Sequence, residues 1–340
     1  FFNMESQLIA KTRNFSSNKN IGGDLEGLSL NSLSGKSVSL SKKRQFRKNF
    51  SNLSISTSEV NTSESMNNSP VYQVKDHYNM IRTLGMGTYS YVRLATNIRS
   101  GKQVAIKTSR GTNSRDLLKK EYELLKRLSD DNIIKVYNHF EDDSKKESYI
   151  IMEYFKGQNL AEYIEENGPM NEKNAQIVLK QLLASIENLH ELGIAHRDIK
   201  PENILVNEEL EIKLIDFNIS KAKDSNSVKD SKKKFVSTFY TQVSSPLYCA
   251  PELKNSIFYT ESIDIWGLGV ILFTMLFGQL KSYKIPFDTK EKCDFLQSII
   301  RSEDVSKNCR DFLEALLSRS PEERPTPSQC YSYEWISNID

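Results

Sequence analysis

The sequence contains few cysteines and no excess of charge of either sign. Its four cysteines, Cys249, Cys293, Cys309 and Cys330, are widely spaced among 340 residues and form no CxxC pair. This spacing argues against a disulfide framework or a zinc site and favours reduced thiols in the cytosol. The 46 basic and 44 acidic residues nearly cancel, so the composition does not indicate a protein that binds nucleic acid.

Long hydrophobic runs are also missing. The longest run, Ile263–Gly278, is too short for a comfortable membrane span and contains Asp264. We therefore predict that it forms a buried core helix and that the chain has no membrane span. The opening residues, FFNMESQ, contain no basic stretch followed by an apolar one, so we expect no secretory signal.

Residues 1–70 differ in composition from the rest of the chain. Aromatic residues are few, and 26 of the 70 positions are Ser or Asn. Such a segment buries too little apolar surface to offset its ordering entropy, so we predict a mostly disordered tail. Within it, residues 42–50 (KKRQFRKNF) are basic and include two phenylalanines. A solvated basic patch is the simplest interpretation; the alternatives are a nuclear address, a contact with acidic lipid or an inhibitory segment that mimics a substrate.

From His77 onward the pattern changes to short strands and then to helices. The stretches IRTLG, YVRLAT, KQVAIKT, IIKVYNHF and SYIIMEY are typical of strands separated by turns. One amphipathic helix, SRDLLKKEYELLKRL, interrupts them. A longer helix is predicted to begin at an Asn171 cap and to end at Gly193. We predict an α+β fold with a mainly β part at 77–153, a mainly α part at 156–340 and a ligand site in the crevice between them.

A glycine turn and a lysine–glutamate pair indicate a phosphate site in the β-rich part. In LGMGTYSYV, Gly85 and Gly87 lie in a turn between strands, where bare backbone can approach a phosphate closely. A strand follows this turn instead of a helix, which argues against a dinucleotide-binding βαβ unit. Lys107 ends the strand VAIK; in the next helix Glu121 lies on the apolar stripe and Glu123 on the polar face. A carboxylate on an apolar stripe needs a partner, so we predict that Glu121 pairs with Lys107.

The stretch IAHRDIKPENIL is the most specific motif in the sequence. It places Asp198, Lys200 and Asn203 in a loop before an apolar strand, and a second apolar strand, in KLIDF, delivers Asp216. Together they supply a carboxylate that can accept a hydroxyl proton, an ammonium that balances phosphate charge, and an Asn–Asp pair of oxygens suited to Mg²⁺. This set fits phosphoryl transfer, in which catalysis is mainly positioning and charge neutralisation.

Taken in order, these motifs resemble those of the eukaryotic protein kinase family across residues 77–340. GMGTYSYV is similar to the glycine-rich loop, HRDIKPEN to the catalytic loop, DFN to the metal-binding motif and APE (250–252) to the end of the activation segment. Lys200, two positions after Asp198, is typical of the serine/threonine branch, and RPTPSQCYSYEWI is weakly similar to the calcium/calmodulin-dependent group. The resemblance implies a two-lobed enzyme that uses ATP and Mg²⁺ to phosphorylate Ser or Thr hydroxyls of protein substrates.

The resemblance also implies a role for each matching residue. Asp198 would orient and deprotonate the substrate hydroxyl, Lys200 would contact the γ-phosphate, and Asn203 and Asp216 would ligate Mg²⁺. Met152 would be the gatekeeper of the adenine pocket. The implied ATP-binding residues are Leu84, Gly85, Met86, Gly87, Thr88, Tyr89, Ser90, Val92, Ala105, Lys107, Glu121, Met152, Glu153, Phe155 and Leu205.

Two structural contacts and one regulatory site follow from the same resemblance. Glu252 should pair with Arg324, and Asp264 should brace the catalytic loop. Thr241, eleven residues before Glu252, is a candidate phosphorylation site whose phosphate could dock on Arg197. An unmodified loop threonine is the alternative.

Asn218 departs from the family pattern, because it replaces the glycine that usually follows Asp-Phe. Glycine there gives the backbone freedom for a flip that moves Asp216 on and off the metal. Asn tolerates a left-handed backbone better than most residues and removes no catalytic group. We therefore predict an active enzyme with a less accessible flip; the alternatives are a pseudokinase that serves as a scaffold, and a small-molecule kinase of the same fold. We expect a cytoplasmic location, with the nucleus as the alternative, and no nucleic-acid partner.

Overall fold

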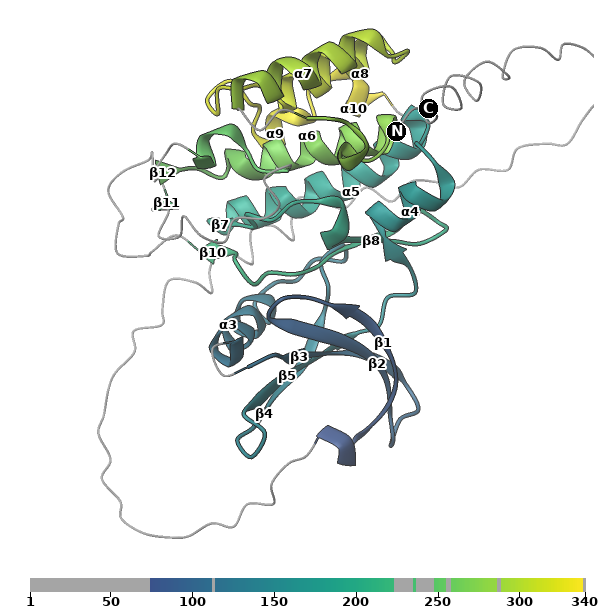
Figure 1. Ribbon diagram of the computed structural model, residues 1–340, viewed down its shortest axis with the longest axis vertical. Coiled ribbons are helices and arrows are strands. Elements are labelled where there is room, and N and C mark those ends of the chain that lie inside the picture. Colours follow the sequence, from purple (N-terminus) through teal and green to yellow (C-terminus); the bar gives the residue numbers. More distant parts are fainter. Residues whose placement is uncertain are drawn as a thin grey trace, which may run out of the picture. The chain divides into compact units, whose positions relative to one another are not determined.

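The computed structural model describes residues 74–111, 114–222, 235–236, 248–254, 258–285 and 289–338. The predicted tail at 1–70, its basic cluster at 42–50 and the candidate phosphorylation site Thr241 lie outside these residues. The described chain from residue 74 contains a five-stranded sheet followed by a mainly helical part (Figure 1). The predicted α+β class is therefore confirmed.

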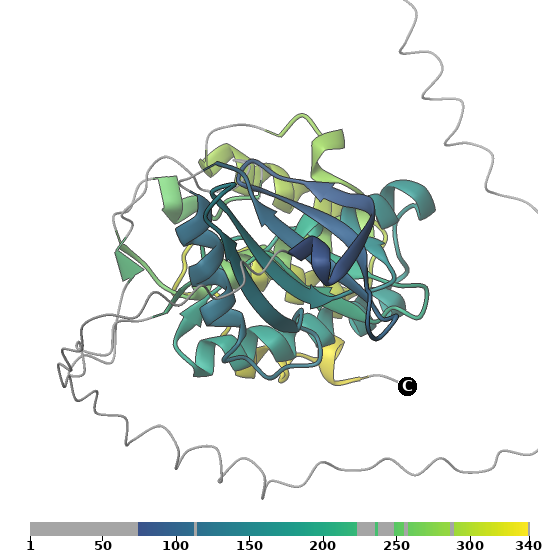
Figure 2. The same ribbon diagram turned by 90° about the horizontal axis from the view of Figure 1, so that it is seen from below.

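The sheet is antiparallel throughout, with strand order β1-β2-β3-β5-β4. Its strands are β1 (Tyr78–Met86), β2 (Ser90–Asn97), β3 (Gln103–Ser109), β4 (Val136–Asp142) and β5 (Glu147–Glu153). A short 3-10 helix, η1 (Val74–Asp76), precedes them, and α3 (Arg115–Leu125), which lies between β3 and β4 in the chain, packs against β3, β4 and β5. Figure 2 shows α3 lying along the sheet.

The two faces of the sheet bury different side chains. Along β3, Val104 and Ile106 belong to a small core cluster on one face, whereas Ala105 belongs to the main core cluster on the other. Successive side chains of a strand point to opposite faces, so Lys107 lies on the same face as Ala105. Strand alternation therefore places the Lys107 ammonium on the side of the main core, which extends into the helical part.

The second part of the chain consists of helices joined by very short strands. Its helices are α4 (Leu160–Asn167), α5 (Glu172–Glu191), α6 (Ser262–Phe277), α7 (Thr289–Ser302), α8 (Lys307–Leu316), α9 (Pro327–Cys330) and α10 (Glu334–Ser337). Its strands are β6 (Gln158–Asn159), β7 (Ile194–Ala195), β8 (Ile204–Val206), β9 (Ile212–Leu214), β10 (Lys221–Ala222), β11 (Phe235–Val236) and β12 (Phe258–Tyr259). Among its described residues are also the 3-10 turns η3 (Pro201–Asn203), η4 (Pro251–Lys254) and η5 (Leu280–Ser282).

The two helices predicted with most detail are both present. The side chain of Asn171 caps α5 by accepting a hydrogen bond from the N–H of Asn174, and Gly193 follows the helix with a φ of 71°. The apolar run at 263–278 forms α6, whose residues 263–275 are all buried. No helix in the described ranges is long and apolar enough to cross a membrane. All four cysteines are thiols.

Candidate active site

Lys107, Glu121 and Asp216 form a charge cluster that joins the sheet to the helical part, in which Lys107 and Glu121 are buried and Asp216 is half-buried. The Lys107 ammonium lies 2.7 Å from both carboxylate oxygens of Glu121 and 3.0 Å from Oδ1 of Asp216. The backbone N–H of Phe217 also donates to Glu121, at 3.2 Å. Glu123 is exposed, so the helical periodicity picked the correct carboxylate.

The Lys107 ammonium and the two carboxylates stabilise one another against the cost of burial, but burial and the like charge of Asp216 still raise the pKa of Glu121 above its ordinary value. Burial alone would lower the pKa of the Lys107 ammonium, but the charges and hydrogen bonds of Glu121 and Asp216 raise it above its ordinary value. Burial would likewise raise the pKa of Asp216, yet Lys107, with smaller contributions from His196 and Lys200, lowers it. Lys107 and Asp216 are therefore both charged at neutral pH.

The loop between β7 and β8 holds a second polar cluster. Oδ2 of Asp198 accepts hydrogen bonds from the Lys200 ammonium at 2.7 Å and from the Asn203 amide at 2.8 Å. The same amide nitrogen lies 2.9 Å from the carbonyl oxygen of Asp198. The other carboxylate oxygen, Oδ1, is buried and has no hydrogen-bond partner within the described residues. A buried acceptor is costly to leave unpaired, so Oδ1 is an acceptor that fits an incoming donor.

Asp264, at the start of α6, fixes the backbone of this loop as predicted. Its two carboxylate oxygens accept the N–H groups of His196 and Arg197, at 2.9 and 2.8 Å. Oδ2 also lies 2.9 Å from Nε2 of His190. Arg197 has a φ of 73°, a left-handed conformation that costs of order 1–3 kcal/mol in a non-glycine residue. The two hydrogen bonds to Asp264 offset this strain and hold Asp198 in place.

The residues implied in adenine binding lie on the sheet, on β8 and on the segment that joins the two parts. Ala105 and Met152 are buried partners across β3 and β5, and Val92 and Leu205 are half-buried. Glu153, at the end of β5, pairs with Lys213 at 2.8 Å. Phe155 follows it and is half-buried.

The turn between β1 and β2 carries the implied phosphate-binding residues. It is closed by a 2.8 Å hydrogen bond from the N–H of Gly87 to the carbonyl of Ser90. Met86, at the end of β1, is 72% exposed, and Leu84 packs against the main core. Thr88 and Tyr89 lie within this turn. The contacts of the Asp198 and Asp216 carboxylates given above come from Lys107, Lys200 and Asn203, which lie on other segments.

The oxygens available for a divalent metal come from Asn203 and Asp216. The described hydrogen bonds of Asn203 use its amide nitrogen, and those of Asp216 use Oδ1. This leaves Oδ1 of Asn203 and Oδ2 of Asp216, which are the hard oxygen ligands that Mg²⁺ prefers. Across the described ranges there is no cluster of three or more His, Cys, Asp or Glu side chains that could hold a metal by itself. The two oxygens therefore fit an ion whose remaining ligands come from outside the protein.

Glu252 and Arg324 form the predicted buried ion pair. Two nitrogens of the guanidinium lie 2.7 and 2.8 Å from the two carboxylate oxygens. The Arg324 side chain is fully buried and stacks 5.2 Å from the ring centroid of Trp266. This pair anchors the 3-10 turn η4, where the APE sequence lies, to the helical part.

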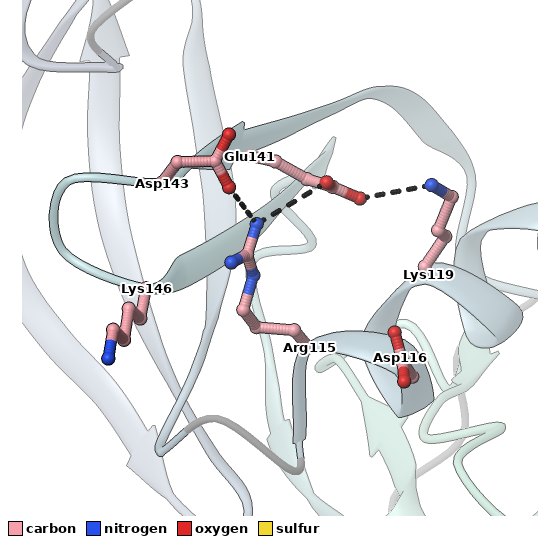
Figure 3. A pocket seen from close by; sticks show the side chains of 6 residues that line it. All are labelled: Arg115, Asp116, Lys119, Glu141, Asp143 and Lys146. Atoms are coloured by element: carbon pink, nitrogen blue, oxygen red, sulfur yellow. Dashed lines mark hydrogen bonds and ion pairs between the residues drawn. The ribbon is translucent and has the colours of Figure 1, made fainter.

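A polar surface hollow lies between α3 and the β4–β5 hairpin (Figure 3). Arg115 pairs with Glu141 and Asp143, and Lys119 pairs with Glu141. The charges that line the hollow thus largely neutralise one another. None of the predicted site residues lines it, so we do not regard it as the catalytic site.

Sequence reasoning missed two residues that position the site. A Cβ on Gly267 of α6 would lie 2.5 Å from the Cβ of Ile199, in the loop that carries Asp198. A Cβ on Gly157 would lie 2.4 Å from the carbonyl oxygen of Val206 on β8. Both glycines permit a close approach of backbone. Gly267 could have been identified because it lies inside an apolar helix, where a glycine usually allows close packing against a neighbouring segment.

Comparison with known proteins supports the picture drawn from this geometry. The family described as "Protein kinase domain" matches residues 78–336. The serine/threonine-protein kinase cds1 of Schizosaccharomyces pombe is 31% identical over 287 residues, covering 77% of this chain and 59% of the relative. NUAK family SNF1-like kinase 1 of Mus musculus is 32% identical over 276 residues, covering 78% and 39%. A probable myosin light chain kinase of Dictyostelium discoideum is 30% identical over 300 residues, covering 84% and 82%.

Proposed function

The chain belongs to the protein kinase family, and from this premise we propose that it is a serine/threonine protein kinase that transfers the γ-phosphoryl group of ATP to protein hydroxyls. The matched region spans less than two thirds of two of the relatives described above, so their activities support this proposal by likeness alone. The observation that carries it is the buried Oδ1 of Asp198, which has no hydrogen-bond partner among the residues that the structure describes. An acceptor held in this way suits the proton of a substrate hydroxyl.

The proposed reaction is a single displacement at the γ-phosphorus of ATP. The hydroxyl oxygen of the substrate forms a bond to phosphorus, the bond from phosphorus to the β–γ bridging oxygen breaks, and ADP leaves. The hydroxyl proton passes to Asp198, whose Oδ2 is oriented by Lys200 and Asn203. Lys200 contributes positive charge beside the transferred group, where negative charge is spread over the phosphoryl oxygens.

In this proposal, the sheet and the segment after β5 bind the nucleotide. Lys107, held by Glu121, contacts the α- and β-phosphates, and the backbone of Gly85, which lies in β1 and not in the predicted turn, and of Gly87, in the turn after β1, covers them. Ala105 and Met152 contribute apolar surface to the adenine pocket. Mg²⁺, when bound through Asn203 and Asp216, neutralises charge on the phosphates.

Thr241 is the proposed regulatory site, and it lies outside the described residues. The proposal is supported by Arg197, whose guanidinium stacks 5.3 Å from the ring of Tyr259 and can bind a phosphate. Mass spectrometry of active protein should find phosphate on Thr241, and Thr241→Ala should lower activity. Active protein without that phosphate would remove the regulatory role. We also propose a cytoplasmic location, which the reduced thiols support.

The test of the activity is transfer from labelled ATP by the purified chain, with Mg²⁺ and generic protein substrates. Asp198→Asn should lower the rate by about 10²–10⁴-fold, the usual loss of a general base, while nucleotide binding stays. Phosphoamino-acid analysis of the product should yield phosphoserine or phosphothreonine. A wild-type chain that binds nucleotide but transfers nothing, whether or not Thr241 is phosphorylated, would instead indicate a scaffold.

A further inference from the structure

The side chain of Asn218 contacts the carboxylate that is proposed to hold the metal. Its amide nitrogen donates a hydrogen bond to Oδ1 of Asp216. The same oxygen accepts the Lys107 ammonium at 3.0 Å. Both donors therefore hold one oxygen of the carboxylate, and Oδ2 is left for another ligand. Glycine, which the family usually has at position 218, offers no such donor.

The backbone around this contact explains why the side chain matters. Asp216 has a left-handed backbone conformation, with a φ of 64°, and Asn218 does not. In this conformation Asn218 therefore makes no use of the tolerance of left-handed φ that asparagine offers. What asparagine adds here is an amide donor, aimed at a residue whose own backbone is strained.

The neighbouring residue is fixed as well. Phe217 is 1% exposed, and its ring lies edge-to-face with His196 at a centroid distance of 4.6 Å. Its N–H donates to Glu121. The Asp-Phe-Asn segment is thus held through the Phe217 ring, the Phe217 N–H and the Asp216 carboxylate. Of these three contacts, only the one to the Asp216 carboxylate involves Asn218, the residue that differs from the family pattern.

We propose that Asn218 is a positioning residue that locks the Asp216 carboxylate in its metal-binding orientation. The proposal rests on the proposed function, because it assigns Asp216 to Mg²⁺. Two consequences follow. The chain binds Mg²⁺–nucleotide more tightly than a variant without the amide, and it resists the flip that would carry Asp216 away from the metal. A hydrogen bond to a charged group corresponds to about ten- to a hundredfold in an equilibrium constant.

The first experiment measures binding and not turnover. Calorimetry with a non-hydrolysable ATP analogue, with and without Mg²⁺, compares the full wild-type chain with Asn218→Ala and Asn218→Gly. Both variants should lose about tenfold or more in Mg²⁺-dependent affinity, with metal-free nucleotide affinity unchanged. Asn207→Ala is the matched control, because Asn207, which is half-buried, also donates its amide to a carboxylate, that of Glu211 at 2.8 Å. It should behave as wild type.

The second experiment uses ligands selective for the flipped-out state. Their affinity should rise by about tenfold in Asn218→Ala, and Asn218→Gly should show at least as large a rise. If only the glycine variant changes, backbone freedom is the cause and the amide has no positioning role. Wild-type Mg²⁺–nucleotide affinity in Asn218→Ala would also overturn the proposal. A wild-type chain that transfers no phosphate, yet shows both binding shifts on substitution, would contradict the proposed function and leave the positioning role standing.

Discussion

The Lys107 ammonium and the Glu121 carboxylate are joined at 2.7 Å through both carboxylate oxygens, at a point where both side chains are buried. Strand β3 supplies the cation and helix α3 the anion. Because Lys107 also reaches Asp216, the pair links the position of α3 to that of the metal-binding segment. Movement of α3 would leave the Glu121 carboxylate without its cation, while Lys107 would keep its contact with Asp216.

Glu121→Gln should therefore lower both stability and activity. Removing one partner of a buried ion pair costs about 3–5 kcal/mol, and we expect a loss near the lower end because the glutamine oxygen still accepts a hydrogen bond. Chemical denaturation and transfer assays measure the two effects. Glu123→Gln, on the exposed face of the same helix, should change neither; an equal effect of both substitutions would contradict the assignment of Glu121.

Arg324→Ala should destabilise the helical part severely. The guanidinium is fully buried and makes two hydrogen bonds to Glu252, so its removal leaves a carboxylate without its partner, at a cost of about 3–5 kcal/mol. Arg301→Ala, which breaks the exposed pair with Glu314, should cost about 0–1 kcal/mol. Urea unfolding of the two variants distinguishes these values. Similar losses in both would show that the Arg324 pair adds little.

Most of the features that could be predicted from the sequence depend on patterns within a single helix or strand. The helical period predicted that Glu121 is buried and Glu123 exposed. The Asn171 cap predicted the start of α5, and the apolar strand in KLIDF predicted that Asp216 lies at a strand end. These features depend on local periodicity and on capping chemistry. The resemblance to kinases added the pairing of Glu252 with Arg324.

Contacts set by the approach of distant elements could not be predicted in this way. The Lys292 ammonium of α7 lies 3.0 Å from the carbonyl of Cys249, beside the ring of Trp266, and nothing in the sequence pairs these residues. The sequence suggests only a backbone effect of Asn218, because it does not show that Asp216 is the residue with the left-handed conformation. Such details depend on tertiary packing.

Gly267→Ala should disturb the catalytic loop through packing. The added Cβ would lie 2.5 Å from that of Ile199, and such overpacking typically costs about 1–3 kcal/mol. Because Ile199 follows Asp198 directly, the transfer rate should fall while the affinity for nucleotide changes little. The double variant Gly267→Ala with Ile199→Gly removes the Cβ of Ile199, and with it the closest contact, so it should recover part of the rate. No recovery would indicate that the close contact is not the cause.

The acid limit of stability should depend on Asp264. Burial alone would raise its pKa, but the hydrogen bond and charge of His190, with the charge of His196 and the N–H of Arg197, hold it below the ordinary value. An aspartate has a pKa of about 3.9 in the unfolded chain. The ionised carboxylate therefore contributes stability that is fully present above about pH 4 and is lost as pH falls through the lower, folded-state pKa.

Asp264→Asn should accordingly be less stable than wild type at neutral pH, and the difference in unfolding free energy should shrink below about pH 4. Denaturation curves between pH 2 and 7 measure it. Asp131→Asn, which changes an exposed carboxylate, should follow the wild-type curve. A difference between wild type and Asp264→Asn that stays constant down to the lowest pH would mean that the Asp264 carboxylate is not preferentially ionised in the folded protein.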